Sequence, residues 1–183
     1  MPNIVMRIIL KFILILPIFS STSDADDHLY FKIGLWDFKH ETGGLALNIK
    51  KVTNNYFNIF NLGELTQIYE FTGFTDKNNH FSKGKEVQDR EEQAVYLSTG
   101  LQKMIYLSNN LTFVPSFSIG LYEAFDAGKD MGFPIEFKSE VELNHNFSNG
   151  SLLGLSYNHI SNADIGNKNP GSDSILINFK KNF

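Results

Sequence analysis

The chain has 183 residues, no cysteine and a formal net charge of −4 at pH 7. This length is enough for one domain with a hydrophobic core or for one small barrel. Nucleic acid is not an expected partner, because phosphate binding needs clusters of Lys and Arg that the sequence lacks. The histidines are scattered without metal-binding spacing and thiols are absent, so no metal or cofactor is expected.

The N-terminal residues have the pattern of a secretory signal peptide. Basic residues precede an apolar run over residues 12–19, and small polar residues follow it. The run is shorter than the roughly 20 apolar residues that a transmembrane helix needs. Ser23-Asp24-Ala25 offers a small-x-small cleavage site, with Ser21-Thr22-Ser23 as the alternative. We therefore predict a signal peptide over residues 1–25 and a mature domain over residues 26–183, with a retained membrane anchor as the alternative.

The mature chain shows the alternation of β-strands. An exported domain without disulfides needs another source of stability, and closing a sheet into a barrel satisfies every strand edge. Apolar and polar residues alternate with period two, most clearly in FPIEFKSEVELNHNF, residues 133–147. The predicted strands cover residues 29–38, 43–52, 62–74, 92–107, 111–124, 133–147, 150–162 and 174–183.

The connections indicate the kind of barrel. Short turns alternate with longer polar loops, and the last strand ends on Phe183, similar to the terminal signal of bacterial outer-membrane proteins. We therefore predict an all-β fold, an eight-stranded antiparallel transmembrane β-barrel in the bacterial outer membrane. Its narrow interior would hold the charged side chains of strand 133–147, so a transport pore is not expected. A soluble lipocalin-like barrel or a β-sandwich is the alternative.

The last two predicted strands carry residue types suited to acyl transfer. His159 and Ser161 are two residues apart, so they share the more apolar face of strand 150–162. Asp173 has the parity of the apolar residues of the returning strand, which places it on the same face and at the same end. Polar residues on a lipid-facing surface are costly unless they pair with one another. We therefore predict that the three side chains converge near the outer leaflet.

These residues have the chemistry of a serine hydrolase. Ser161 would attack an ester carbonyl, His159 would take its proton, and Asp173 would orient the imidazole and stabilise its charged form. Asn162 follows the nucleophile, and its side-chain amide, with backbone N–H groups of the next turn, would stabilise an oxyanion. From spacing alone, polar residues at the membrane interface without a catalytic role are the alternative.

The segment HISNADIGNKNPGSDS, residues 159–174, resembles the C-terminal motif of the PagL-type lipid A 3-O-deacylases, which are exported eight-stranded outer-membrane barrels. Their motif has His-x-Ser-Asn on the penultimate strand and an acidic residue fourteen positions after the His. The resemblance implies that His159 is the base, Ser161 the nucleophile, Asn162 the oxyanion residue and Asp173 the acid. The family pattern has Glu where this chain has Asp173. Only about the last 30 residues match closely; the rest agrees in layout.

The resemblance implies an outer-membrane serine esterase that removes the ester-linked 3-O acyl chain from lipid A of lipopolysaccharide, without metal or cofactor. Lys39, Lys129 and Lys168 lie in predicted outward loops and are candidates to contact the lipid A phosphates. A second copy of the chain is a candidate partner, in a homodimer. The alternative function is a non-enzymatic small outer-membrane barrel, of the adhesin or membrane-stability type, that acts through its outer loops.

Overall fold

The computed structural model describes residues 28–39, 44–59, 62–77, 91–126 and 129–181. The predicted signal peptide, residues 1–25, and the terminal Phe183 lie outside these ranges. The described strands are β1 (His28–Trp36), β2 (Gly44–Asn58), β3 (Glu64–Lys77), β4 (Glu91–Gln102), β5 (Ile105–Tyr106), β6 (Leu111–Asp126), β7 (Ile135–Asn146), β8 (Leu152–Ser161) and β9 (Ser172–Lys180).

The strands form one closed antiparallel sheet. Its order is β4-β3-β2-β1-β9-β8-β7-β6-β5, and a further pairing of β4 with β6 closes the ring. The two-residue β5 continues β4 after a break at Lys103 and Met104 and also pairs with β6. The result is an eight-stranded antiparallel β-barrel, which confirms the predicted fold. No helix in the described ranges is long and apolar enough to cross a membrane.

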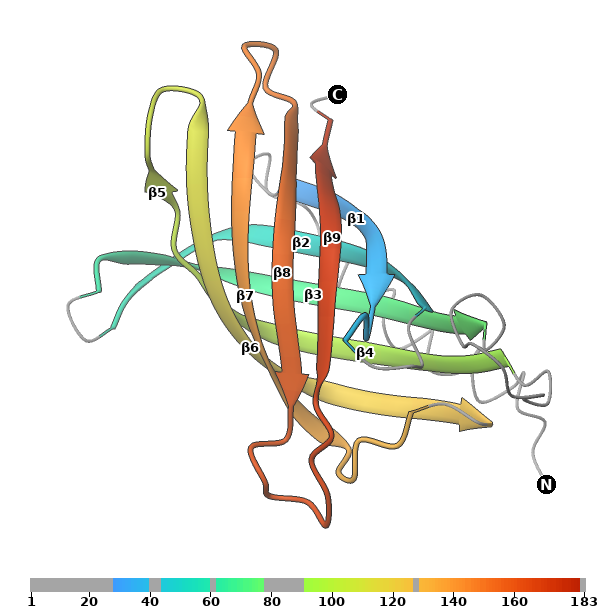
Figure 1. The fold of residues 1–183 in the computed structure, drawn as a ribbon. Coiled ribbons are helices and arrows are strands. Elements are labelled where there is room, and N and C mark those ends of the chain that lie inside the picture. The colour runs from blue at the N-terminus through green and yellow to red at the C-terminus, as the bar shows by residue number, and fades with distance from the viewer. Residues whose placement is uncertain (1–27, 40–43, 60–61, 78–90, 127–128, 182–183) are drawn as a thin grey trace.

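The two ends of the barrel differ. In Figure 1, β8 and β9 lie side by side, and the connection of residues 162–171 extends beyond them at the bottom of the view. We call this end the loop end. The short turn between β7 and β8 lies at the opposite end, here called the turn end. The predicted alternation of short turns and longer loops is therefore present for these strands.

The exterior of the barrel is apolar and the interior is polar. On β8, Leu155 points outward and is 58% exposed, whereas Glu140 and Glu142 on β7 point inward and are 2% and 1% exposed. A soluble barrel would have the opposite distribution, with apolar residues inside. An apolar band around a polar interior is typical of a membrane-spanning barrel.

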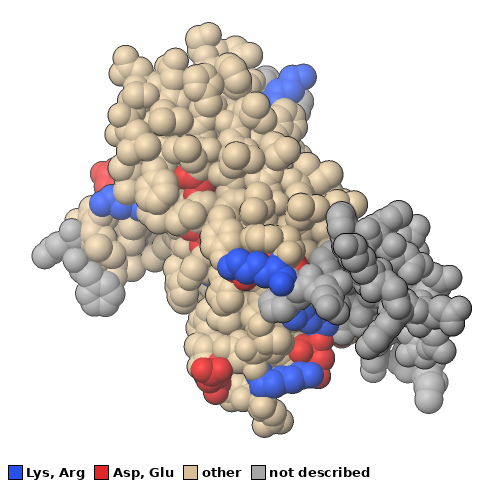
Figure 2. Space-filling model, viewed as in Figure 1, with Lys and Arg blue, Asp and Glu red and all other residues tan. Residues whose placement is uncertain are grey.

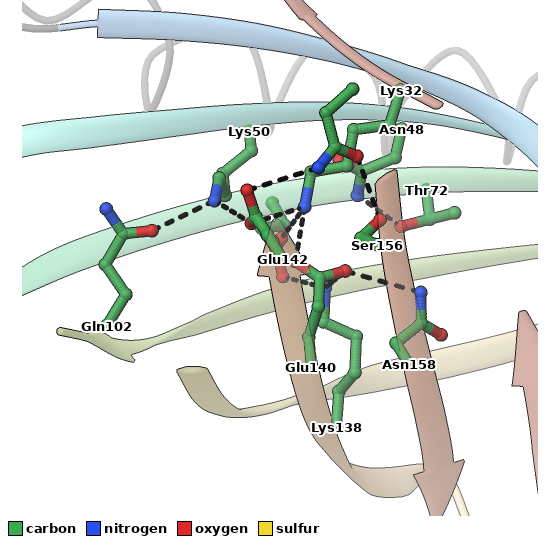
Figure 3. A network of polar contacts seen from close by, with 12 residues as sticks. Lys32, Asn48, Lys50, Thr72, Gln102, Lys138, Glu140, Glu142, Ser156 and Asn158 are labelled. Carbon is green, nitrogen blue, oxygen red and sulfur yellow. Dashed lines mark hydrogen bonds and ion pairs between the residues drawn. The ribbon is translucent and has the colours of Figure 1, made fainter. Parts of the chain in front are cut away.

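A band of charged side chains fills the middle of the interior (Figure 3). Lys32 of β1 lies 2.9 Å from Glu142 of β7 and also pairs with Glu140. Lys138 pairs with Glu70 and lies 3.4 Å from Glu140. The band therefore couples opposite walls of the barrel through ion pairs. Its polar members that Figure 3 labels are Lys32, Asn48, Lys50, Thr72, Gln102, Lys138, Glu140, Glu142, Ser156 and Asn158.

Apolar clusters lie inside the barrel on both sides of this band. The cluster at the turn end contains Tyr30, Val52, Ile68 and Leu152. The cluster at the loop end contains Trp36, Ala46, Phe74, Ala94, Tyr96, Tyr122, Met131, Ile160 and Leu176. The inward-facing residues of β8 are mostly polar, but Leu152 and Ile160 are apolar. Both point inward at levels where the interior of the barrel is apolar. Ile160 anchors the strand between His159 and Ser161.

Two predicted strands differ from the observed ones by more than a few residues. The sequence suggests that the second strand ends at residue 52, but β2 runs on to Asn58. Its pairing with β3 shifts register between Val52 and Tyr56 and then resumes, so a β-bulge takes the place of the expected turn. The predicted strand 92–107 is broken after Gln102, where the N–H of Lys103 donates to the Pro115 carbonyl at 3.0 Å.

Candidate active site

The pairing of β8 with β9 brings His159 and Asp173 together. The two residues are direct partners in this antiparallel ladder, so their side chains leave the sheet on the same, exterior face. The Nδ1 atom of His159 lies 3.1 Å from Oδ1 of Asp173. The imidazole is 45% exposed, whereas the Asp173 side chain is only 8% exposed. The acid is thus enclosed by its partners, and the imidazole is accessible from outside the barrel.

Ser161 lies on the same face, at the last position of β8. It is two residues beyond His159 and is opposite Phe137 of β7. Its side chain is partly exposed at the loop end. No hydrogen bond links the side chains of Ser161 and His159 among the described contacts. The structure therefore places Ser161, His159 and Asp173 next to one another on the exterior, with a hydrogen bond between His159 and Asp173.

The imidazole leans toward the loop end. A β-carbon on Gly171 would lie 2.9 Å from Cε1 and 3.4 Å from Nε2 of His159. Ser172 pairs with Ile160, so Gly171 stands at the level of Ser161, one residue farther along the two strands. The Nε2 edge of the ring is therefore turned toward the level of Ser161, while the Nδ1 edge binds Asp173.

Two further residues bind Asp173: Tyr157, which the sequence analysis does not single out, and Lys39, which it names only as a candidate phosphate contact. The Tyr157 hydroxyl donates to Oδ1, the oxygen that His159 contacts. The ammonium of Lys39 lies 3.0 Å from Oδ2 and donates to the Tyr157 hydroxyl at 3.0 Å. Together these hydrogen bonds raise the pKa of Lys39 above its ordinary value, so this lysine stays charged. The shared parity of Tyr157 and His159 is a signal available in the sequence; the position of Lys39 is not.

A tight turn follows Ser161. Ala163 and Asp164 have φ angles of 53° and 61°, and the N–H of Ile165 donates to the Asn162 carbonyl at 3.1 Å. Positive φ at both central positions is the geometry of a type I′ turn. Residues other than Gly are uncommon in this conformation, and such strain clusters at functional sites.

Asn162 is buried beneath this turn. Its side-chain amide donates to the carbonyls of Met131, at 2.7 Å, and Lys168, at 2.8 Å. Its backbone N–H donates to Oδ1 of Asn169 at 3.1 Å. The residue is fully shielded from solvent. In this arrangement the amide hydrogens join the β6–β7 and β8–β9 connections. The sequence analysis expects this amide to stabilise an oxyanion instead.

The lysines of the loop end are paired with carboxylates. Lys129 binds both oxygens of the buried Asp37 at 2.7 Å and also donates to the Gly171 carbonyl. Lys168 lies 2.8 Å from Asp130, and this hydrogen bond lowers the pKa of the Asp130 carboxyl. On the face seen in Figure 2, charged side chains are sparse over the upper body and gather toward the lower end, as the loop end does in Figure 1. Among the described residues no group of three His, Asp or Glu could hold a metal ion.

The comparisons with known proteins agree with this geometry. The model of the family "Lipid A 3-O-deacylase (PagL)" matches residues 44–182. The chain belongs to this family. It is therefore a carboxylic ester hydrolase of the outer membrane, and the family match favours the enzyme over the non-enzymatic barrel. The comparison with curated proteins gave no match.

Solved structures share the fold of this deacylase family member. A crystal structure of the outer membrane enzyme PagL is 14% identical, with a TM-score of 0.55, and the match covers 86% of this chain and 99% of that chain. Ail, the attachment invasion locus protein of Yersinia pestis, is 7% identical, with a TM-score of 0.50, over 84% of this chain and 95% of that chain. At these identities the likeness establishes the barrel fold alone.

Proposed function

We propose that this enzyme removes the ester-linked 3-O acyl chain of lipid A through a Ser161–His159–Asp173 triad on the lipid-facing surface of the barrel. Membership of the lipid A 3-O-deacylase family supports the reaction. The observation that supports the site is the cross-strand pair of His159 and Asp173, whose side chains meet at 3.1 Å on the exterior, beside Ser161.

The triad would act by acyl transfer. With its Nδ1–H donated to Asp173, His159 keeps a lone pair on Nε2 and can take the proton of the Ser161 hydroxyl. The Ser161 oxygen attacks the ester carbonyl, and the sugar oxygen leaves with the proton from His159. Water then attacks the acyl-enzyme with His159 as base, which releases the fatty acid and restores the serine.

The exterior position fits a substrate that is itself a membrane lipid. Below Tyr157, toward the turn end, the outward side chains of β8 are Leu155 and Leu153, which are 58% and 50% exposed. An acyl chain could lie along this apolar wall while its ester reaches the level of Ser161. We propose that the loop end faces outward, where the ester enters by lateral diffusion. This requires export, so we also propose that residues 1–25 are cleaved, which N-terminal sequencing of the mature protein tests.

The turn after Ser161 is the proposed oxyanion site. The backbone N–H groups of Ala163 and Asp164 belong to a strained turn that follows the nucleophile by one residue. Among the described contacts, neither N–H group has an acceptor within the protein. Rigid backbone donors of this kind stabilise a developing oxyanion. Asn162 would then act by holding the turn, through its bonds to the carbonyls of Met131 and Lys168.

Mass spectrometry of lipid A tests this proposal. Cells that express the native chain should lose one hydroxyacyl chain from lipid A, and cells that express Ser161→Ala or His159→Asn should not. Heat-modifiable gel mobility of the outer-membrane fraction verifies that each variant is folded and inserted. Deacylation by a folded Ser161→Ala protein, or unchanged lipid A with a correctly inserted native protein, would overturn the proposal.

A further inference from the structure

The two carboxylate oxygens of Asp173 have different partners. Oδ1 accepts from His159 Nδ1 and from the Tyr157 hydroxyl, and Oδ2 lies 3.0 Å from the Lys39 ammonium. Lys39 also donates to the Tyr157 hydroxyl, so Tyr157, Lys39 and Asp173 form a closed triangle. We call this triangle the acid clamp.

The strand geometry explains why Tyr157 reaches the acid. Tyr157 is opposite Ile175 in the β8–β9 ladder, one outward-facing step from the pair of His159 and Asp173. Diagonal neighbours on one face of an antiparallel pair are about 7–8 Å apart, a distance that an aromatic side chain spans. The phenol thus approaches Asp173 from the turn-end side, where the imidazole, which leans toward the loop end, leaves room.

The ring of Tyr157 is itself held in place. Phe38 packs edge-to-face against it, with ring centroids 6.4 Å apart at 72°. The Lys39 ammonium lies 5.3 Å from its centroid. Both contacts come from the segment that follows β1, which pairs with β9. The hydroxyl is therefore fixed by an element outside the two strands that carry the triad.

The Tyr157 hydroxyl adds a restraint that the ion pair between Lys39 and Asp173 does not give. Lys39 is 53% exposed on a long flexible side chain, so its ion pair with Oδ2 alone restrains the Asp173 carboxylate only weakly. The Tyr157 hydroxyl binds the ammonium and at the same time tethers Oδ1 beside His159. Oδ1 is thereby kept for the imidazole, and Oδ2 takes the cation.

We propose that Tyr157 is a positioning residue of the deacylation reaction, which holds the short acid Asp173 in register with His159, and that Lys39 completes the clamp. The proposal rests on the triad of the proposed function. It also gives a physical account of Asp at this position: a Glu would carry the carboxylate one methylene farther, into the space that the Tyr157 hydroxyl and Lys39 occupy.

The kinetics of purified barrels in detergent micelles with lipid A as substrate test the clamp. Tyr157→Phe removes only the hydroxyl, which binds a charged group, so kcat should fall about ten- to a hundredfold with KM little changed. In an Asp173→Asn background the same substitution should cause no further loss, because the clamp has then lost its carboxylate. Lys39→Met leaves the hydroxyl in place and should cost no more than about fivefold, as expected for an exposed ion pair.

A rescue experiment separates positioning from a purely structural role. Asp173→Glu alone should lower kcat, and Tyr157→Phe combined with Asp173→Glu should recover part of it, because removing the hydroxyl makes room for the longer acid. A native kcat for Tyr157→Phe, an equal loss in the Asp173→Asn background, or no recovery in the double variant would overturn the proposal. Activity of Ser161→Ala would instead refute the triad itself, so the two failures are distinguishable.

Discussion

Gly171 lies against the imidazole of His159, so closely that a β-carbon on it would stand 2.9 Å from Cε1. Its φ angle is +62°, a conformation that favours glycine. Gly171→Ala should therefore push the ring away from the level of Ser161 and lower kcat by about a hundredfold, the effect of a misplacement of about 1 Å. Steady-state deacylation rates measure this.

Gly73→Ala is the matched control, because a β-carbon at Gly73 meets nothing within 4 Å. It should keep the native rate. If Gly171→Ala also keeps it, with the barrel folded as judged by gel mobility, the contact with Gly171 does not orient the imidazole.

A second serine stands beside His159. Ser139 of β7 is its direct partner on the other side of β8, exposed on the same exterior face. Ser139, His159 and Asp173 thus form one cross-strand row. The tilt of the imidazole toward Gly171 nevertheless favours Ser161 as the nucleophile. A fluorophosphonate probe should label Ser161, and Ser139→Ala should keep the activity. Peptide mass mapping identifies the labelled serine, and a label on Ser139 would contradict the assignment.

The fold could be predicted from the sequence because one physical rule governs most of it. Residues such as Glu140 and Leu143 alternate between a narrow interior and the exterior, and this period-two pattern marks each strand and its two faces. The rule fails where the pairing of a strand is irregular. The β-bulge after Val52 and the break after Gln102 depend on pairing with β3 and β6, which no local pattern encodes.

The placement of the candidate site residues could be predicted from the sequence where the alternation of the strand determines it. The parity of His159 and Asp173 places both side chains on one face, and the observed register makes them direct partners. The clamp residue Lys39 comes from a distant part of the chain, so only the closure of β1 on β9 brings it to the acid. Asn162 has the same even parity as the inward residues of β8. This parity already indicates a buried side chain, which the structure has.

Removing one charge from the band inside the barrel should destabilise the fold strongly. Lys32 is buried between Glu140 and Glu142, and its removal would leave their charges without a partner from β1. Breaking a buried ion pair costs about 3–5 kcal/mol. Lys32→Met should therefore lower the free energy of unfolding by about this amount, measured by urea titration of the barrel in micelles.

The exposed pair of Lys168 and Asp130 provides the control for that measurement. Lys168→Met should change stability by less than about 1 kcal/mol, because surface ion pairs contribute little. Equal effects of the two substitutions would contradict the expectation that breaking the buried pairs of Lys32 costs more than breaking a surface pair.

Asn162 offers a test between two roles. If its amide holds the loops, as its bonds to Met131 and Lys168 indicate, then Asn162→Ala should loosen the connection of residues 162–171. Lys168 lies in this connection, so trypsin should cleave the variant there and leave the native protein intact, with kcat reduced in the same variant. If instead the amide stabilises the oxyanion directly, kcat should fall while resistance to trypsin stays native. Because both readouts come from one variant, the comparison assigns Asn162 to the support of the turn or to the chemistry itself.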